Sequence, residues 1–167
     1  MTDYNNLKRL AKNYLKARHT FLTESKELPD LSGNDNIVGR IGELVAIQYL
    51  RNQGRTVIKN LNPVEKGYDL KTDKEEQISV KIITAENKRG RTTRIKQPWT
   101  ELIFIKLNHL YEVDTIGHIT KTAFSKALED GILKTQEPYT DIKLLADNGL
   151  FDLYGERKTG KDVTDYL

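Results

Sequence analysis

Two neighbouring segments, Gly67-Tyr68-Asp69-Leu70-Lys71 and Gln77-Ile78-Ser79-Val80-Lys81-Ile82-Ile83, decide the fold of this chain. The second segment is rich in β-branched residues and follows the first after a short polar turn, so the pattern predicts a hairpin. Successive side chains of a strand point to opposite faces, so Ser79 and Lys81 share one face, opposite the apolar side chains beside them. Aspartate is depleted in strands and buried lysine is uncommon. We therefore expect Asp69 and Lys81 to line one polar patch.

A helix is predicted directly upstream of this hairpin. Apolar residues recur at helical spacing within Ile37 to Asn52, with Asp35 or Asn36 as the N-cap and Gly54 as the stop signal. The other expected elements are strands over 56–58, 68–71, 77–84 and 102–107, strand ends within 110–119, a helix or turn over 121–128, and a loose tail over 163–167. This order predicts an α/β (α+β) fold with a central mixed β-sheet flanked by helices.

The 167 residues fit a single domain, which we divide into an N-terminal helical extension (1–30), a core (37–107) and a C-terminal elaboration (108–167). Tyr4 to Leu22 has the apolar spacing of an amphipathic helix, which is either a dimer arm or a lid on the core. No apolar run reaches the ~20 residues of a membrane span. No signal peptide is visible, so a cytoplasmic location without membrane association is expected. The absence of cysteine excludes disulfides, thiolate catalysis and cysteine-bound zinc.

Three side chains and one carbonyl make up the expected reactive centre. Glu43 is the only acid of the upstream helix and lies at the border of its apolar stripe, so it faces either solvent or a polar site. Asp69 either ends a turn or offers oxygen ligands to a cation. Lys81 marks an edge strand or has a chemical role. Together with the Val80 carbonyl, two carboxylates can hold a hard divalent cation, beside a lysine that assists an attacking water.

A basic segment follows the hairpin. The formal net charge is only +3, but residues 88–97 concentrate basic and hydroxyl side chains: Lys88, Arg89, Arg91, Thr92, Thr93, Arg94, Lys96 and Gln97. Such a segment can track a phosphate backbone, although many basic runs are simply solvated loops. Trp99, just beyond it, is either a core aromatic or a stacking partner for a base.

This arrangement resembles the PD-(D/E)xK nuclease superfamily, through Gly39-Arg40-Ile41-Gly42-Glu43-Leu44-Val45, Gly67-Tyr68-Asp69-Leu70 and Ile78-Ser79-Val80-Lys81. The resemblance covers about residues 37–104 and implies hydrolysis of DNA phosphodiesters with Mg²⁺, or Mn²⁺ in its place. It implies that Glu43, Asp69, Ser79 and Lys81 form the catalytic centre, with metal ligands from Glu43, Asp69 and Val80. It favours a small restriction-type endonuclease that binds double-stranded DNA as a homodimer.

Two positions depart from the superfamily pattern. Tyr68 stands where a proline often precedes the aspartate, and Ser79 replaces the second acid of the motif. Some restriction endonucleases of the superfamily have such a Ser-x-Lys form and recruit an acid from elsewhere; here Glu43 is the first candidate, with Glu86 and Glu101 behind it. The alternatives are a Holliday-junction resolvase-like or repair nuclease, a catalytically inactive DNA-binding protein on the same fold, or a protein-interaction domain without a nucleic-acid role.

Overall fold

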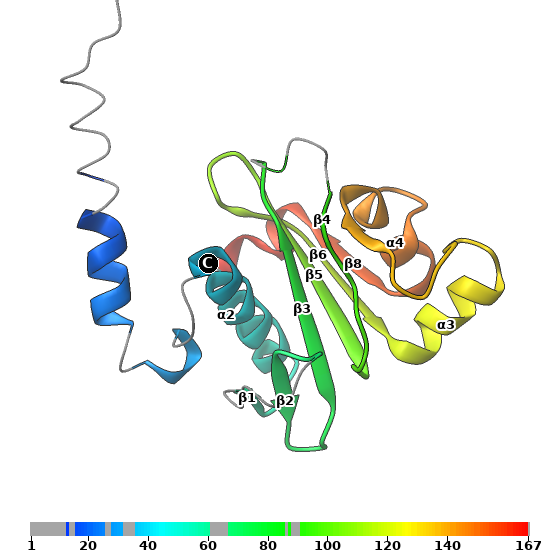
Figure 1. Ribbon diagram of the computed structural model, residues 1–167, viewed down its shortest axis with the longest axis horizontal. Helices are drawn as coiled ribbons and strands as arrows, with labels where there is room; N and C mark the ends of the chain where they lie inside the picture. Colours follow the sequence, from blue (N-terminus) through cyan, green and yellow to red (C-terminus); the bar gives the residue numbers. More distant parts are fainter. Residues whose placement is uncertain are drawn as a thin grey trace, which may run out of the picture.

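The computed structural model describes residues 13, 16–25, 28–31, 36–60, 67–85, 87 and 91–166. Its centre is a six-stranded sheet in the order β1-β2-β3-β5-β6-β8 (Figure 1). The strands are β1 (Val57–Lys59), β2 (Leu70–Thr72), β3 (Gln77–Ile83), β5 (Glu101–Leu107), β6 (Val113–Thr120) and β8 (Glu156–Thr159). All neighbours are antiparallel except β3 and β5, which are parallel, so the predicted mixed sheet is confirmed.

The upstream helix, α2 (Ile37–Asn52), forms where the sequence predicts it. Asn36 caps it by accepting a hydrogen bond from Gly39 N at 3.0 Å, and Gly54 follows its end with a left-handed φ of +78°. Its buried residues pack on one face of the sheet, in an apolar cluster with Val57, Leu70, Ile78, Val80, Ile103 and Ile105. Gly42 of this helix approaches β3 closely, since a Cβ added to it would lie 3.0 Å from Ile82 Cδ1.

The opposite face of the sheet carries the shorter helices α3 (Lys121–Glu129) and α4 (Leu150–Tyr154) and the 3₁₀ helix η2 (Ile142–Leu145). A second apolar cluster fills this side, including Trp99, Phe104, Phe124 and Phe151. Successive residues of β5 alternate between the two clusters, Leu102 facing one and Ile103 the other. β5 is therefore buried on both faces of the sheet, which agrees with its nearly all-apolar sequence.

Several predicted elements differ from the structure. Residues 113–120 form one continuous strand, because the chain turns earlier, at 108–112. The basic segment is not a loop throughout: residues 91–94 form β4 (Arg91–Arg94), which pairs with β7 (Tyr139–Asp141). The tail is not loose, since η3 (Gly160–Asp162) and η4 (Thr164–Tyr166) flank the fully buried Val163. Its apolar side chain adds enough burial to hold this segment against the core.

The N-terminal extension is described only in part. Residues 16–24 are helical and lead to η1 (Pro29–Leu31), whereas most of the helix predicted over 4–22 lies outside the described residues. Ser25 accepts a 2.6 Å hydrogen bond from the buried Arg40 of α2, and the Arg40 guanidinium lies over the Phe21 ring. These contacts agree with a lid on α2. Within the described part of the chain, no helix has the length and hydropathy that crossing a membrane requires.

Gly67 shows why the segment before β2 needs glycine. Its φ is +103°, a left-handed region that L side chains rarely adopt. A Cβ on this residue would lie 2.4 Å from Pro98 Cδ and 2.7 Å from Pro98 N. Both the backbone conformation and the close approach of Pro98 therefore exclude a side chain immediately before Tyr68 and Asp69.

Replacing Gly67 with alanine should lower the free energy of unfolding by about 3 kcal/mol, since it adds strain and overlap at once. Gly54→Ala is the control: Gly54 has a similar left-handed φ but open space around it, so the loss should be about 1 kcal/mol. Urea unfolding followed by the fluorescence of Trp99, the single tryptophan, measures both. Equal losses in the two variants would show that Pro98 does not restrict this position.

Candidate functional site

A cleft of about 410 Å³ opens at the exposed edge of β3, between α2 and β4. Residues from all three elements line it: Asn36, Val38, Gly39, Glu43, Asp69, Val80, Lys81, Ile82, Thr84, Asn87, Thr92 and Thr93. The cleft thus contains the predicted helix acid, the predicted strand acid, the predicted lysine and the residue whose carbonyl was expected to bind metal. Sequence reasoning therefore placed these four residues in one cleft correctly.

The cleft exists because β2 and β3 separate after only two paired residues, Leu70 with Ile78 and Lys71 with Gln77. Beyond that point Asp69 lies just before β2, although the sequence predicted it within the strand. Its side chain takes the place of a backbone partner: Asp69 Oδ2 accepts a 2.6 Å hydrogen bond from Val80 N. The N–H and C=O of one residue point to the same side of a strand, so the Val80 carbonyl also faces this edge.

Lys81 reaches back along the same edge. Its Nζ donates hydrogen bonds to Ser79 Oγ at 2.8 Å and to the Val80 carbonyl at 3.2 Å, and it lies 3.9 Å from Asp69 Oδ2. The fully buried Ser79 lies between them and donates to Asp69 Oδ2 at 3.4 Å. Ser79, which replaces the second acid of the motif, therefore links the lysine to the remaining aspartate and supplies no carboxylate of its own.

Glu43 has a partner that the sequence analysis did not identify. Lys59 Nζ lies 2.5 Å from Glu43 Oε2, and the Lys59 side chain is only 7% exposed. Burial raises the pKa of Glu43, whereas the hydrogen bond and charge of Lys59 lower it. The charge of Asp69 adds to the effect of burial, and the net result is a raised pKa. Strand alternation could have revealed this lysine: the buried Val57 is two residues earlier in β1, so Lys59 points to the same side, toward α2.

The nucleic-acid-binding candidates fall into three groups. Lys88 and Arg89 lie outside the described residues, as does Glu86. Thr92 and Thr93 line the cleft, while Arg91 and Arg94 are exposed on β4, followed by the exposed Lys96 and Gln97. Trp99 is 1% exposed and its ring contacts Phe124 edge-on at 5.1 Å between centroids. The core interpretation of Trp99 is thus confirmed, and a base cannot stack on it.

The donor set of the cleft fits a magnesium-type cation. Among the described residues, no group of three or more histidines, aspartates and glutamates is arranged to hold a metal ion. The residues that line the cleft include two carboxylates, Glu43 and Asp69. Mg²⁺ is commonly held by one or two carboxylates and keeps several waters. The Val80 carbonyl supplies a further oxygen at the same edge. These oxygen atoms match what Mg²⁺ prefers, but a cation at Glu43 has to compete with the ammonium of Lys59.

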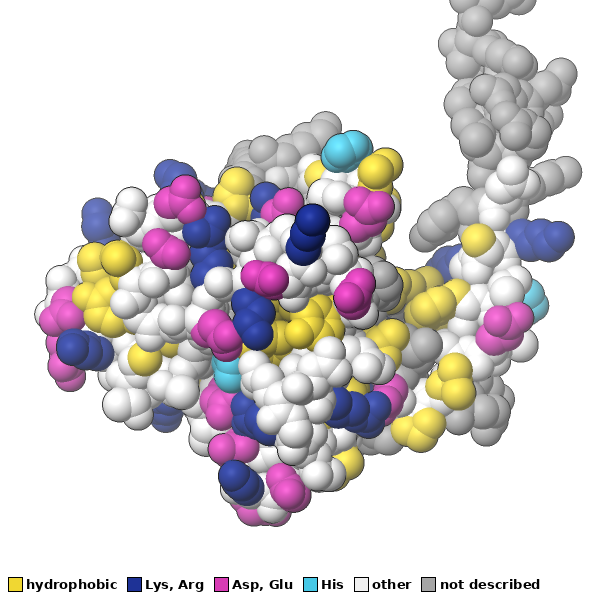
Figure 2. Space-filling model, turned by 180° about the vertical axis from the view of Figure 1, so that it is seen from behind, with side chains coloured by type: hydrophobic (Ala, Val, Ile, Leu, Met, Phe, Trp, Pro, Cys, Tyr) yellow, Lys and Arg dark blue, Asp and Glu magenta, His cyan; other side chains and the backbone are white. Residues whose placement is uncertain are grey.

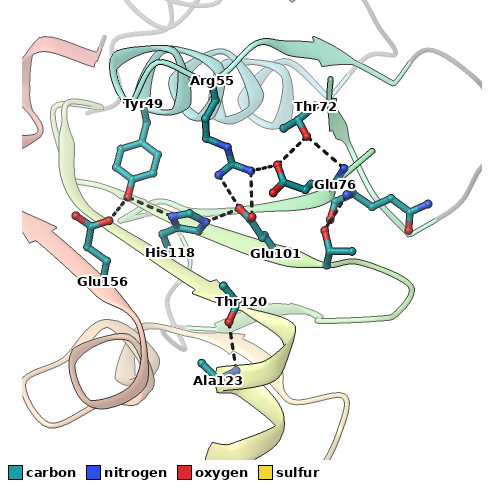
Figure 3. Close-up of polar contacts among 11 residues, drawn as sticks. Tyr49, Arg55, Thr72, Glu76, Glu101, His118, Thr120, Ala123 and Glu156 are labelled. Atoms are coloured by element: carbon teal, nitrogen blue, oxygen red, sulfur yellow. Dashed lines mark hydrogen bonds and ion pairs between the residues drawn. The ribbon is translucent and has the colours of Figure 1, made fainter. Parts of the chain in front are cut away.

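Glu101, the other acid considered as a substitute, is not part of the cleft. It belongs to a polar network across the α2 side of the sheet, which Figure 3 shows. Arg55 donates to both oxygens of Glu101, at 2.8 and 3.0 Å, and His118 Nε2 lies 2.7 Å from its Oε2. The expectation that Glu101 can replace the missing acid is therefore wrong, because its carboxylate is already fully engaged elsewhere.

The network extends to both sides of Glu101. Arg55 also donates to Glu76 at 2.7 Å, and Tyr49 OH donates to Glu156 at 2.7 Å while lying 3.4 Å from His118 Nδ1. Burial alone raises the pKa of Glu101, but the hydrogen bonds and charges of His118 and Arg55 outweigh it and lower the pKa to about 2. The network thus stabilises the fold through an ionised, nearly buried carboxylate.

No family model matches this sequence, and no curated protein matches it either.

Glu101 should make stability depend on pH in the acid range. Its folded pKa is below the ordinary value of 4.5, so its contribution is present above pH 4.5 and is lost as the pH falls toward 2. Between pH 6 and pH 3 the wild type should lose about 2 kcal/mol more than Glu101→Gln does. Urea unfolding at the two pH values measures this. Glu129→Gln, which removes an exposed acid of α3, should follow the wild type; a Glu101→Gln variant that also follows it would contradict the argument.

Proposed function

We propose that this protein is a metal-dependent DNA endonuclease, of the restriction type, that hydrolyses phosphodiester bonds in its β3-edge cleft. One observation carries the proposal: Glu43 of α2, Asp69 just before β2, and Val80 and Lys81 of β3 line the same cleft. The mixed sheet with a helix packed on it also agrees with what the superfamily resemblance implies.

Glu43, Asp69 and the Val80 carbonyl would hold Mg²⁺, with Mn²⁺ as a substitute. When bound, the cation would act as a Lewis acid on a phosphoryl oxygen and favour ionisation of water at neutral pH. Val80 N fixes the Asp69 carboxylate through its 2.6 Å hydrogen bond, so this ligand is positioned before any cation arrives. Preorganised ligands of this kind reduce the cost of assembling the charged site.

Lys81 is the residue that acts on the phosphate. Its side chain is 21% exposed, and its ammonium is held at the cleft by Ser79 and the Val80 carbonyl. In this position it can stabilise the negative charge that develops on the phosphorane and can orient the attacking water. The hydroxyl of Ser79 bridges Lys81 and Asp69. A second acid at this position would bind the metal as well as contact the lysine.

Double-stranded DNA is the proposed substrate, and a homodimer is the proposed active form, because two strands must be cut. A Holliday-junction resolvase-like or repair nuclease would need the same core, so the substrate has to be separated by experiment.

The second candidate is a DNA-binding protein of the same fold that does not cleave. The Glu43–Lys59 ion pair favours it, since a cation at Glu43 must compete with a buried ammonium. Ser79 replaces the second acid of the motif, so the described residues of the cleft supply only Glu43 and Asp69 as carboxylates. Of these two, only Asp69 would then be open to a cation, since the Lys81 ammonium lies 3.9 Å from it.

Cleavage of unmodified plasmid and of a synthetic four-way junction, in Mg²⁺ and in EDTA, tests the proposal. The wild type should give discrete plasmid fragments only with Mg²⁺, and Lys81→Ala should reduce the rate at least ~100-fold. Lys71→Ala is the matched control, since Lys71 is on the neighbouring strand and pairs with Glu75 outside the cleft. Cutting of the junction alone would instead indicate a resolvase, and binding of either DNA without cleavage would indicate the second candidate.

Direct cation binding separates the two candidates without relying on turnover. Titration calorimetry with Mn²⁺ should detect binding by the wild type, about tenfold weaker binding by Asp69→Asn, and stronger binding by Lys59→Met, in which Glu43 loses its competing cation. Lys71→Met is again the control. If Lys59→Met binds Mn²⁺ no more tightly than the wild type, Glu43 is not a ligand of the cation.

A further inference from the structure

The pairing of β4 with β7 contains an extra residue. Arg91 is opposite Asp141 and Arg94 is opposite Tyr139, so three steps along β4 correspond to two steps along β7. Such a β-bulge re-aims the side chains of the strand that carries it. In a regular strand, residues three apart point to opposite faces, so Arg91 and Arg94 would diverge.

The bulge instead brings both arginines to one aromatic ring. The guanidinium carbon of Arg94 lies 4.4 Å from the centre of the Tyr139 ring, and that of Arg91 lies 5.6 Å from it. Tyr139 is 41% exposed, so this arrangement is at the surface. We call these three residues the arginine–tyrosine stack. The two threonines between the arginines, Thr92 and Thr93, line the cleft.

Two guanidinium groups close together repel each other, and the ring face compensates part of that cost through cation–π attraction. Arg91 uses Nε toward Asp141 Oδ2 at 3.6 Å, and Arg94 uses Nη1 to donate to the Glu137 carbonyl at 2.9 Å. A guanidinium has five N–H donors, so each arginine retains donors after these contacts. The stack is therefore a pair of positive groups that the Tyr139 ring, Asp141 and the Glu137 carbonyl orient before any ligand binds.

We propose that the arginine–tyrosine stack binds phosphates of the DNA duplex backbone and directs that backbone past Thr92 and Thr93 into the cleft. This inference rests on the proposed function for the chemistry of the cleft, but it assigns the contact with DNA to the β4–β7 ribbon. A two-stranded ribbon has the dimensions to lie in the major groove. Tyr139 acts as a positioning residue, because it holds the arginines and does not itself carry charge.

Duplex DNA fits this surface better than a single strand. Proteins that bind single strands stack bases on aromatic side chains. None of the described residues lining the cleft is aromatic, and the Tyr139 ring already carries the guanidinium groups of Arg91 and Arg94. On the reverse side, the described lysines and arginines are interspersed with aspartates and glutamates (Figure 2). Mixed charge of this type is typical of a solvated surface.

Fluorescence anisotropy with a labelled DNA duplex, in EDTA and at several salt concentrations, tests the inference on the full chain. Arg94→Gln should weaken binding about five- to tenfold and reduce the slope of log affinity against log salt by about 1. Arg51→Gln is the matched control, since it removes the same charge from an exposed arginine of α2 that pairs with Asp30, and it should change neither quantity appreciably.

Tyr139 separates orientation from charge. Tyr139→Leu leaves the net charge unchanged but removes the ring, and should weaken duplex binding about threefold, whereas Tyr139→Phe keeps the ring and should bind like the wild type. Thermal melting confirms that each variant is folded. Binding by Tyr139→Leu at the wild-type level, an effect of Arg94→Gln no larger than that of Arg51→Gln, or tighter binding to the single strand would each overturn the inference.

These measurements need no cleavage, so the two proposals fail separately. Loss of duplex binding through the stack in a protein that never cuts DNA would support the inference and contradict the nuclease proposal. Cleavage of DNA that the stack variants leave unaffected would support the nuclease proposal and contradict the inference about the stack. A wild type that binds no duplex even at low salt would overturn both.

Discussion

The peptide N–H of Val80 donates to the Asp69 carboxylate at 2.6 Å, and the arrangement of the whole cleft depends on this one hydrogen bond. A strand edge has backbone groups that must find partners. Here the side chain of Asp69, just before β2, satisfies the N–H, which allows β2 to begin only at Leu70 without leaving this donor unsatisfied. The same bond fixes the carboxylate, and the same peptide unit turns its carbonyl toward the opening. Strand pairing, side-chain orientation and access to solvent are thus set together.

Charge compensation is the second organising feature. Glu43 is paired with Lys59, and Asp69 faces Lys81 across the hydroxyl of Ser79. Burial raises the pKa of Glu43, the Lys59 ammonium opposes that rise, and the charge of Asp69 adds to it. The net pKa of Glu43 stays raised, so Lys59 compensates only part of the cost of burying this carboxylate. Under the proposed function, a substrate phosphate that engaged the Lys81 ammonium would leave Asp69 free to bind a cation, so substrate and metal would favour each other's binding.

Much of the site is predictable from local pattern, because alternation and helical spacing decide which face a residue occupies. Those rules place Asp69, Lys81 and Val80 at one edge and Glu43 nearby. They fail where the answer depends on contacts distant in sequence. The β4–β7 pair joins residues far apart in the chain and contains a bulge, so no local period reveals it. In the sequence, nothing distinguishes Glu101 from other acids at the start of a strand. Only the folded structure shows that Arg55 and His118 bind its carboxylate, away from the cleft.

The polar network below α2 has a consequence for the position of that helix. An apolar helix face can slide on a sheet at modest cost, because one aliphatic contact replaces another. Tyr49 cannot slide in this way, since a shift of one helical turn, about 5.4 Å, would take its hydroxyl away from both Glu156 and His118. The register of α2 is therefore specified by directional bonds near its C-terminal end. Glu43 lies nearly two helical turns before Tyr49 in α2. Its position in the cleft is therefore set by the bonds of Tyr49 to Glu156 and His118, which do not contact Glu43.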